Sequence, residues 1–403
     1  MYDRASPPTI AYRRRDDVPT MEAETVRKVI SRGSRVAVSA ALVLIGAVGG
    51  LPAAQAVPSA PGQLISHTAL PAGWGEWSRA AIVEYRTEGA TRGTTAAAGL
   101  LLLPESPAPA GGYPVVAWDH GTSGLAPHCG LTTNQARNER PLLQAFLDRG
   151  WAVLAPDYLG LSAGSDTVHP YLHTRTEATA TIDLVRAARA AEPSLAKTWA
   201  VVGGSQGGHA ALGTGNLADD YAPELDFRGT VALAPESNFE QILSRLDPSI
   251  PNLPIVDRLV GPFAGMLAGL RATRPDLDVN GLLSARGREV VDAVATSCVD
   301  DFDRAVGGAS IGSLLAKPLS ANGIGAALHD YMVVPTLGYR QPILIAHGAA
   351  DTVVPLPMTL ALLTQMRSAG TRVEFAQYPG GHEEVGVEAR EKVLAFVDGL
   401  LAA

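Results

Sequence analysis

The chain has 403 residues, of which 46% are hydrophobic and 18% are charged, and this composition excludes a disordered chain and a coiled coil. A net charge of −8 argues against a nucleic-acid partner, which would be bound through phosphate contacts. The two cysteines exclude a cysteine-built zinc site and a disulfide-dense scaffold, and they leave room for one disulfide.

The first 56 residues have the pattern of a secretory signal peptide. Basic side chains between residues 27 and 35 precede an apolar run of 16 residues, Val36 to Leu51. The sequence Ala54-Gln55-Ala56 then has the small-x-small form of a cleavage site. A transmembrane anchor is the alternative, but the run is shorter than the roughly 20 residues that a span needs. We therefore expect residues 1–56 to be a signal peptide, cleaved near Ala56, and the mature protein to be secreted.

Cleavage changes the charge of the chain that remains. Residues 1–56 carry eight basic and five acidic side chains, so their removal takes the net charge from −8 to −11, and the mature value is the same whether translation starts at Met1 or Met21. Such an acidic protein is not attracted to anionic lipid, and transient contact with a neutral lipid interface is the lipid contact that we expect. Export to an oxidising compartment favours a disulfide between Cys129 and Cys298 over two separate thiols.

Beyond residue 57, short apolar strands alternate with helices. Strands are predicted at 81–86, 95–103, 114–118, 151–156, 199–202, 230–234, 342–346 and 372–378. Helices are predicted at 131–149, 174–191, 207–217, 358–370 and 383–401. This alternation is typical of an α/β fold with a mostly parallel central sheet and helices on both faces.

The alternation stops between residues 236 and 341. This segment of about 100 residues is helical in character and is interrupted by Pro and Gly, and a structureless loop of that length is unusual in a compact domain. We predict a helical cap inserted after the sixth of the predicted strands. The core then consists of a first part at 57–235 and a second part at 342–403, with the cap or lid at 236–341.

One segment has the form of a nucleophile motif. Gly203-Gly204-Ser205-Gln206-Gly207 matches Gly-x-Ser-x-Gly, directly after a predicted strand and directly before a predicted helix. The serine of such a motif sits on a tight, strained turn, so the residues two before and two after it must lack a side chain. A plain Gly-rich turn is the alternative, since the chain has 42 glycines. We predict that Ser205 is a nucleophile.

The general base is sought among the histidines after Ser205. His209 lies one helical turn after the serine and should pack behind the turn, His329 falls in the predicted cap, and His347 precedes the acid candidate. His382 follows the last predicted strand in a Gly-rich loop, which is the position of the base in an α/β-hydrolase. We predict that His382 removes the proton of Ser205 and later gives it to the leaving group.

The acid candidate is Asp351, which follows the strand at 342–346. Its role would be to fix the imidazole tautomer and stabilise the imidazolium. An aspartate that caps the next helix is the alternative interpretation. Asp301 and Asp303 are other acid candidates, but they fall in the predicted cap.

An oxyanion hole should accompany this triad. One donor is expected to be the backbone N–H of Gln206, and the other that of Gly121 or Thr122, in the loop after the predicted strand 114–118. A plain tight turn is the alternative for this loop. His120 in the same loop is interpreted as a residue that anchors it.

Together these segments resemble the secretory lipase family of α/β-hydrolases, over about residues 65–400. The residues that carry the resemblance are 119–124 with Cys129, 157–161 with 169–172, 203–208, and the loops of Asp351 and His382. The resemblance implies an α/β-hydrolase fold, an extracellular esterase or lipase without a metal, and a cap that forms part of an acyl tunnel. It also implies a disulfide from the segment after the oxyanion loop into the cap, which fits Cys129 and Cys298. The chain departs from fungal members in lacking cysteines for a second disulfide, and Gly130-Leu131-Thr132 differs from their usual Ala-Pro-Ser.

The sequence therefore predicts a secreted serine carboxylic-ester hydrolase, lipase-like, that acts on triacylglycerol or other acyl esters without a cofactor. The apolar stretch 255–270 lines an acyl pocket, acts as a lid against lipid, or packs on the core, and these three interpretations are left open. An exported serine peptidase or amidase of the same fold is one alternative, and a non-catalytic binding protein on a hydrolase scaffold is another. An acyltransferase that uses the same triad is a variant of the first hypothesis.

Overall fold

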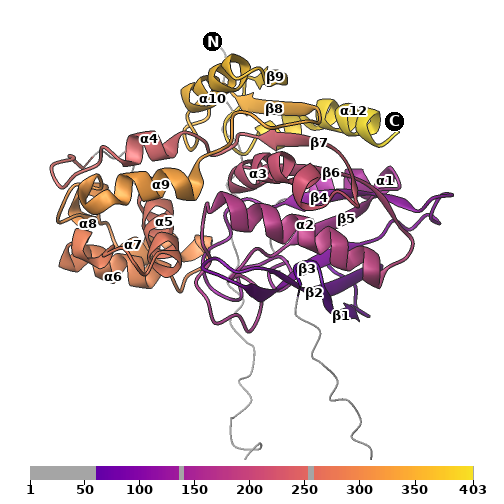
Figure 1. Cartoon of the computed structure of the whole chain (residues 1–403), viewed down its shortest axis with the longest axis horizontal. Coiled ribbons are helices and arrows are strands. Elements are labelled where there is room, and N and C mark those ends of the chain that lie inside the picture. Colours follow the sequence, from indigo (N-terminus) through magenta and orange to yellow (C-terminus); the bar gives the residue numbers. More distant parts are fainter. Residues whose placement is uncertain (1–59, 136–139, 253–257, 403) are drawn as a thin grey trace, which may run out of the picture. The chain divides into compact units, whose positions relative to one another are not determined.

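The computed structural model describes residues 60–135, 140–252 and 258–402 (Figure 1). The predicted signal peptide lies outside these residues. The described strands form one nine-stranded sheet in the order β1-β2-β3-β5-β4-β6-β7-β8-β9. They are β1 Leu64–Ala69, β2 Ala80–Glu88, β3 Thr94–Leu102, β4 Tyr113–Asp119, β5 Ala152–Pro156, β6 Leu195–Gly204, β7 Asp226–Leu233, β8 Ile343–Gly348 and β9 Val373–Tyr378.

The sheet is mostly parallel, as predicted. From β5 through β4, β6, β7 and β8 to β9 every pairing is parallel, whereas β1, β2 and β3 are antiparallel to their neighbours. Every residue of β5 and of β8 is buried, while burial alternates along β2. A strand covered on both faces needs apolar side chains at successive positions, so the short apolar runs of the sequence are the central strands.

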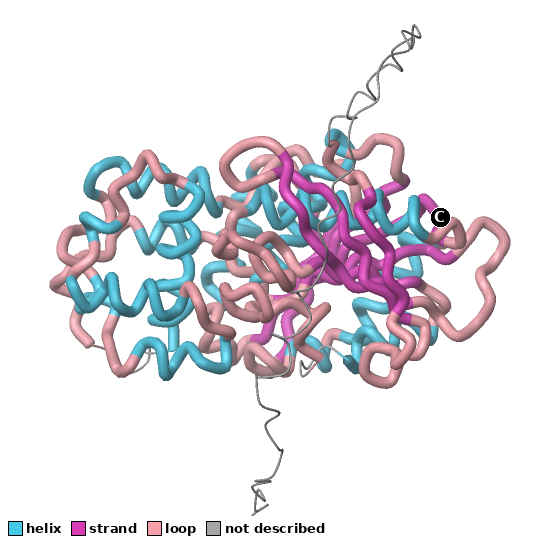
Figure 2. Tube along the Cα trace, turned by 90° about the horizontal axis from the view of Figure 1, so that it is seen from below, coloured by secondary structure: helices cyan, strands magenta, loops and turns pink. Residues whose placement is uncertain are grey.

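Helices cover both faces of this sheet (Figure 2). Side chains of α1 Arg140–Asp148, α11 Val385–Glu388 and α12 Arg390–Leu401 share one buried cluster with the sheet. Side chains of α2 Thr174–Ala191 and α3 Gln206–Tyr221 share a second cluster on the other face. Leu212 of α3 also packs with α10 Leu356–Ser368, which places α10 on the α2–α3 face.

Helices also fill the segment between β7 and β8 where the strand–helix alternation stops. They are α4 Phe239–Leu243, α5 Val260–Thr273, α6 Ala285–Val294, α7 Phe302–Val306, α8 Ile311–Leu314 and α9 Ile324–Met332, and we call them the cap helices. They share one hydrophobic cluster that also takes in Leu125, Tyr171 and Leu172 from core loops. Residues 253–257 of this segment are outside the described part, and the division of the chain at 235/236 and 341/342 stays a prediction. None of the helices among the described residues combines the length and the apolar character needed to cross a membrane.

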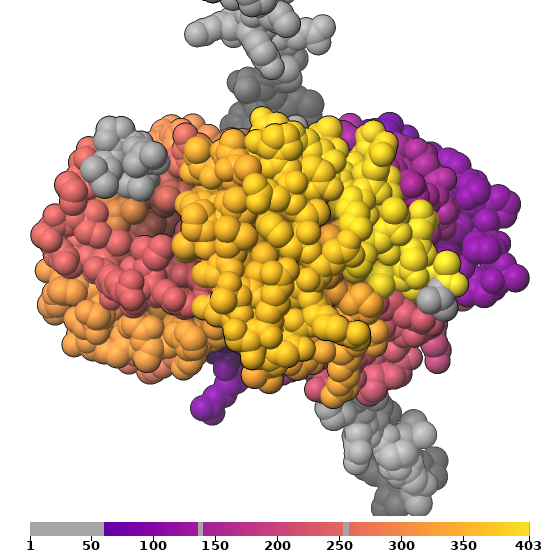
Figure 3. All heavy atoms as spheres, turned by 90° about the horizontal axis from the view of Figure 1, so that it is seen from above, coloured from indigo at the N-terminus to yellow at the C-terminus, as the bar shows by residue number. Residues whose placement is uncertain are grey.

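The cap helices and the C-terminal part of the core lie side by side, in salmon and orange and in gold and yellow (Figure 3). Asn238, just before α4, joins the two parts. Its Nδ2 donates to the carbonyl of Met358 at 3.1 Å, and its Oδ1 accepts from Gln365 Nε2 at 3.1 Å.

The structure differs from the predicted elements at three places. Strand β1 was not predicted, because it is an edge strand with mostly exposed side chains, so the cap follows the seventh described strand and not the sixth. Residues 131–135 are not helical: Thr132 N donates to Asp157 Oδ1 and Thr133 Oγ1 to Gly130 O, and such contacts compete with helix formation. The predicted C-terminal helix at 383–401 is two helices, α11 and α12, which meet at Ala389.

Candidate active site

A strained turn between β6 and α3 presents Ser205. The φ of Ser205 is 57° and its ψ is −121°, a backbone conformation that residues other than glycine seldom adopt. A Cβ on Gly203 would clash with the carbonyl of Gly207, and a Cβ on Gly207 would clash with the backbone of Asp119. The two outer glycines of the motif are therefore sterically required, as the sequence predicted.

The structure brings together the three side chains that the sequence selected as a triad. His382 Nε2 lies 2.9 Å from Ser205 Oγ, and His382 Nδ1 lies 2.7 Å from Asp351 Oδ2. The three residues come from the turn after β6, the loop after β8 and the loop after β9, which all leave the sheet at its carboxyl edge.

The alternatives for the acid take other places. The N-cap residue of α10 is Pro355, so Asp351 is not the cap of that helix. Asp301 forms an ion pair with Arg304 at 2.9 Å, and Asp303 lies in α7 of the cap.

The surroundings of Asp351 favour its charged form. Burial raises the pKa of Asp351, but hydrogen bonds from His347 and His382 outweigh burial and hold the pKa well below its usual value. His347 Nε2 lies 3.3 Å from Asp351 Oδ2, so this second histidine is a neighbour of the acid and not of the serine. Burial lowers the pKa of His382, but the hydrogen bond to Asp351 and the charges of Asp351 and Glu236 outweigh it, and the net pKa is raised. A carboxylate that stabilises an imidazolium is what a general base next to a serine requires.

The predicted oxyanion donors lie around the same serine. Gly121 and Thr122 line a cavity together with Ser205. Gln206 is the first residue of α3, and the first N–H groups of a helix have no carbonyl partner within the helix. The N-terminal end of α3 thus points partial positive charge at the position where an oxyanion would form. Which of Gly121 and Thr122 gives the second donor stays open.

The cavity beside Ser205 has a volume of about 880 Å³ and is lined mainly by apolar side chains. The cap contributes Leu243, Leu246, Phe263 and Met266 to its wall. Ile242 and Val387 also line it and are 47% and 69% exposed, so they lie where the cavity opens to solvent. Within the described part of the stretch 255–270, Phe263 and Met266 line the cavity, and they share a hydrophobic cluster with Leu125 and Tyr171 of the core loops. A role as a lid stays a prediction, and residues 255–257 lie outside the described residues.

Comparison with known proteins decides the family. A model of the family "Secretory lipase" matches residues 127–388, which is more than half of the chain. The chain belongs to the secretory lipase family. This membership makes it a lipase-like carboxylic ester hydrolase, which confirms the class of enzyme that the sequence predicted.

Individual relatives of this member of the secretory lipase family are distant. It is 24% identical to "Lipase A" of Moesziomyces aphidis over 79% of this chain and 72% of the relative. Its fold is similar to the closed state of Candida antarctica lipase A, with a TM-score of 0.70 and 20% identity over 85% of this chain and 83% of that one. The rice cell wall degrading esterase LipA from Xanthomonas oryzae gives a TM-score of 0.66 and 23% identity over 85% and 99% of the two chains. These likenesses confirm the α/β-hydrolase fold.

A second carboxyl group in the site was missed by the sequence reasoning. Glu236 Oε1 lies 3.3 Å from Ser205 Oγ, and Tyr171 OH lies 3.1 and 3.3 Å from the two oxygens of Glu236. Burial raises the pKa of Glu236. Glu236 follows β7 closely, as Asp351 follows β8, so its place after a strand of the predicted parallel sheet was a signal that could have found it.

A buried polar network behind the nucleophile was also not predicted. His209 Nδ1 lies 2.7 Å from Glu177 Oε2, and Gln206 Nε2 donates to Glu177 Oε1 at 2.7 Å. Burial raises the pKa of Glu177 and lowers that of His209, but their mutual attraction outweighs burial, so the pKa of Glu177 is lowered and that of His209 raised. His209 Nε2 also lies 3.0 Å from the carbonyl of Met332, at the end of the cap helices. His209 thus packs behind the turn, as expected.

The predicted disulfide is present and joins core to cap. Cys129 and Cys298 are bonded, across 169 positions of sequence. Beside the bond, Leu125 N donates to the carbonyl of Ser297 at 2.9 Å, and Val299 N donates to that of Ser123 at 3.0 Å.

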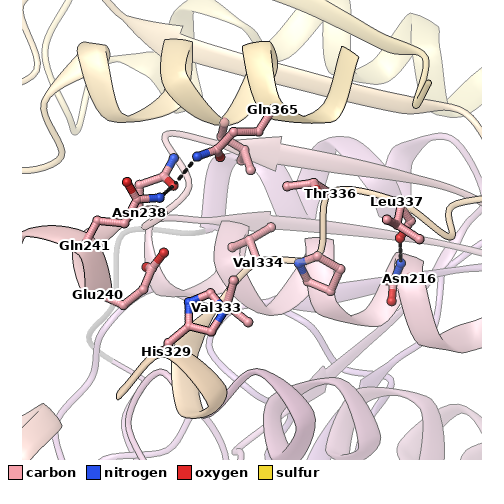
Figure 4. A pocket seen from close by; sticks show the side chains of 12 residues that line it. Asn216, Asn238, Glu240, Gln241, His329, Val333, Val334, Thr336, Leu337 and Gln365 are labelled. Atoms are coloured by element: carbon pink, nitrogen blue, oxygen red, sulfur yellow. Dashed lines mark hydrogen bonds between the residues drawn. The ribbon is translucent and has the colours of Figure 1, made fainter. Parts of the chain in front are cut away.

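A second cavity, of about 600 Å³, contains none of the triad candidates (Figure 4). It is lined by residues from α3, α4, α9 and α10 and from the segment that leads back to β8, at the junction of cap and core. Glu240 of α4 is 3% exposed there and one of its carboxyl oxygens, Oε2, has no hydrogen-bond partner among the described residues. No nucleophile–base pair lines this cavity, so we place no catalysis in it.

Proposed function

We propose that this secretory lipase is an exported serine hydrolase of carboxylic esters that works through an acyl-enzyme. The observation that carries the proposal is the continuous hydrogen-bonded line from Ser205 through His382 to Asp351. A serine hydroxyl is a weak nucleophile until an adjacent base removes its proton, and a histidine is a better base when a carboxylate fixes its tautomer.

The reaction follows from these contacts. Ser205 Oγ attacks the ester carbonyl carbon while His382 Nε2 takes the hydroxyl proton. The negative charge that develops on the carbonyl oxygen is stabilised by the N–H of Gln206 and by that of Gly121 or Thr122, each donor contributing about 2.7–4 kcal/mol in the transition state. His382 then protonates the leaving alcohol, and a water that His382 activates releases the acid and restores Ser205.

The apolar cavity supports an acyl ester as substrate. Its wall of Leu243, Leu246, Phe263 and Met266 would exclude water from an alkyl chain, at about 25 cal/mol for each Å² of apolar surface removed from water. The relatives named above as lipases and as a cell wall degrading esterase are consistent with this class. The family's description as secretory and the disulfide support an extracellular location.

The test is removal of the Ser205 hydroxyl. Ser205→Ala should lower kcat/KM for a p-nitrophenyl ester by at least about a thousandfold, because attack and proton transfer both start from that oxygen. The variant should also lose labelling by a fluorophosphonate, which mass spectrometry of the intact protein detects.

Ser237→Ala is a matched control. Ser237 is 2% exposed and lies one residue after Glu236, and its Oγ has no hydrogen-bond partner among the described residues, so its loss should leave the rate unchanged. A Ser205→Ala protein with near-native activity would contradict the proposal. Hydrolysis of peptide p-nitroanilides without hydrolysis of esters would favour a peptidase instead, and transfer to an added alcohol would identify an acyltransferase.

A further inference from the structure

Glu236 lies in the cavity beside Ser205, but the proposed mechanism gives it no task. Its side chain is held in place by the Tyr171 hydroxyl, which lies 3.1 Å from Oε1 and 3.3 Å from Oε2, while Oε1 faces Ser205 Oγ at 3.3 Å. Because this carboxyl group lies so close to the nucleophile, it would contact the part of the substrate next to the ester carbonyl.

Among the described residues, only Ser205 and Tyr171 hydrogen-bond to this carboxyl group, which leaves part of it without a donor during the reaction. Ser205 has one hydroxyl hydrogen, and in the productive arrangement it goes to His382 Nε2, so it is not shared with Glu236. Tyr171 also has only one hydrogen to give, whereas the two carboxyl oxygens offer about four acceptor positions. A purely aliphatic group placed against Glu236 would remove water from the carboxyl and offer nothing in exchange, which is unfavourable.

The ligand group that suits Glu236 should not depend on the protonation state of its carboxyl. Burial raises the pKa of Glu236, while the nearby His209 and His382 act in the opposite direction. A hydroxyl fits either form, because it donates to a carboxylate and also accepts from a protonated carboxyl.

We propose that Glu236 binds a hydroxyl group carried by the substrate close to the scissile ester, so that hydroxylated esters are the preferred substrates of this site. The hydroxyl belongs either to the alcohol part, as in a partial glyceride, or to the acyl part, as in a hydroxy-acid ester. This inference rests on the proposed function, since it takes Ser205 as the point of attack.

The experiment compares three decanoate esters: the methyl ester, monodecanoylglycerol and the methyl ester of a β-hydroxy decanoate. The native protein should hydrolyse at least one hydroxylated ester with a kcat/KM about tenfold or more above that of the simple methyl ester. In Glu236→Met this ratio should fall toward one, mainly through a higher KM for the hydroxylated ester. The ester that gains most shows whether the alcohol or the acyl side carries the hydroxyl.

Glu240→Met is the matched control, because Glu240 is a buried glutamate four residues after Glu236 but faces the second cavity (Figure 4). It should keep the native preference. If Glu236→Met does not fold, Glu236→Gln keeps the shape and should lower the ratio by a smaller factor.

Two results would overturn the inference. One is a native protein that prefers neither hydroxylated ester. The other is a Glu236 variant in which all three esters lose activity by the same factor, which would make Glu236 part of the catalytic geometry. Ser205→Ala, measured on the simple methyl ester, tests the proposed function separately.

Discussion

The turn at Ser205 and the cap helices reach their positions by different means. The turn is fixed by backbone sterics, since Gly203 and Gly207 leave no room for a Cβ, and by the buried Glu177–His209 pair behind it. The cap is held mainly by apolar packing in one cluster, together with the disulfide and hydrogen bonds to the core, among them those of Asn238 and the contact of Met332 with His209. Chemistry that needs atoms within a few tenths of an ångström is therefore placed on the constrained part, and substrate binding on the part that tolerates change.

The largest difference is expected from one pair of glycine substitutions. In Gly207→Ala the new Cβ would overlap the backbone of Asp119, and neither the strand of Asp119 nor the turn at Ser205 has room to move away. We therefore expect a loss of more than about 5 kcal/mol in the free energy of unfolding and no measurable esterase activity. In Gly325→Ala, in α9, the nearest heavy atom is Ser244 Cβ at 3.5 Å, an ordinary contact. That variant should be unchanged or more stable by up to about 1 kcal/mol. Urea titration measures the stability of the two variants, and ester hydrolysis measures their activity. Equal effects in Gly207→Ala and Gly325→Ala would contradict the contrast between the turn and the cap.

Removal of the disulfide measures how far the attachment of the cap to the core depends on a covalent bond. Replacing Cys129 and Cys298 by serine releases a loop of 169 positions, which in the loop-entropy account costs up to about 5 kcal/mol of unfolding free energy. The midpoint of denaturant unfolding should fall accordingly, while kcat/KM of the protein that remains folded falls less than in Gly207→Ala. Ser297→Ala, next to the bond, is the control and should have a small effect. An unchanged midpoint would show that apolar packing alone holds the cap.

The pH dependence of catalysis reports on the charges of the core. In the proposed mechanism His382 must be neutral to act as the base. Burial lowers its pKa, but the hydrogen bond to Asp351 and the charges of Asp351, Glu236 and Glu383 outweigh burial and raise the pKa above the ordinary value of about 6.5. kcat/KM should therefore fall about tenfold for each pH unit below a midpoint that lies above pH 6.5. Glu383→Gln removes one of these charges and should move the midpoint to lower pH, whereas Asp292→Asn in the cap should not move it. A native midpoint below pH 6.5 would contradict the electrostatics described here.

The smallest effect is expected at the opening of the cavity. Ile242 of α4 and Val387 of α11 are exposed and line the cavity, so replacing both by serine should reduce activity on an emulsified triglyceride about threefold to tenfold through lost apolar contact with the lipid surface. Activity on a dissolved short-chain ester should change less. Leu360→Ser removes a leucine of similar exposure, 42%, that does not line this cavity, and it should affect neither substrate. Equal losses on both substrates would argue against a role at the lipid surface.

Much of this constrained part could be predicted from the sequence, for a physical reason. The parallel strands end in short loops at one edge of the sheet, so a Gly-x-Ser-x-Gly turn, Asp351 and His382 meet there once the strands are recognised. Strand β1 and the start of α1 were not predicted, since edge strands and threonine-rich turns carry weak apolar patterns.

The polar partners of the site could not be predicted in the same way. Glu177 lies within α2 and pairs with His209 of α3, a contact that depends on how two helices cross. Glu236 and Tyr171 come from separate loops, and their hydrogen bonds depend on the packing of the cap. The packing of the cap helices depends on the apolar cluster that they share, and the spacing of apolar residues within one helix does not determine which other helices it meets.

The place of the cap helices in the topology has a consequence for how the cavity can be altered. α4–α9 occupy a single crossover, between the neighbouring parallel strands β7 and β8, and the remaining crossovers keep their own helices. Lengthening, shortening or relining that one connection leaves the strand order intact. Insertions and substitutions between residues 236 and 341 can therefore change the wall of the cavity while they leave the turn at Ser205 in place.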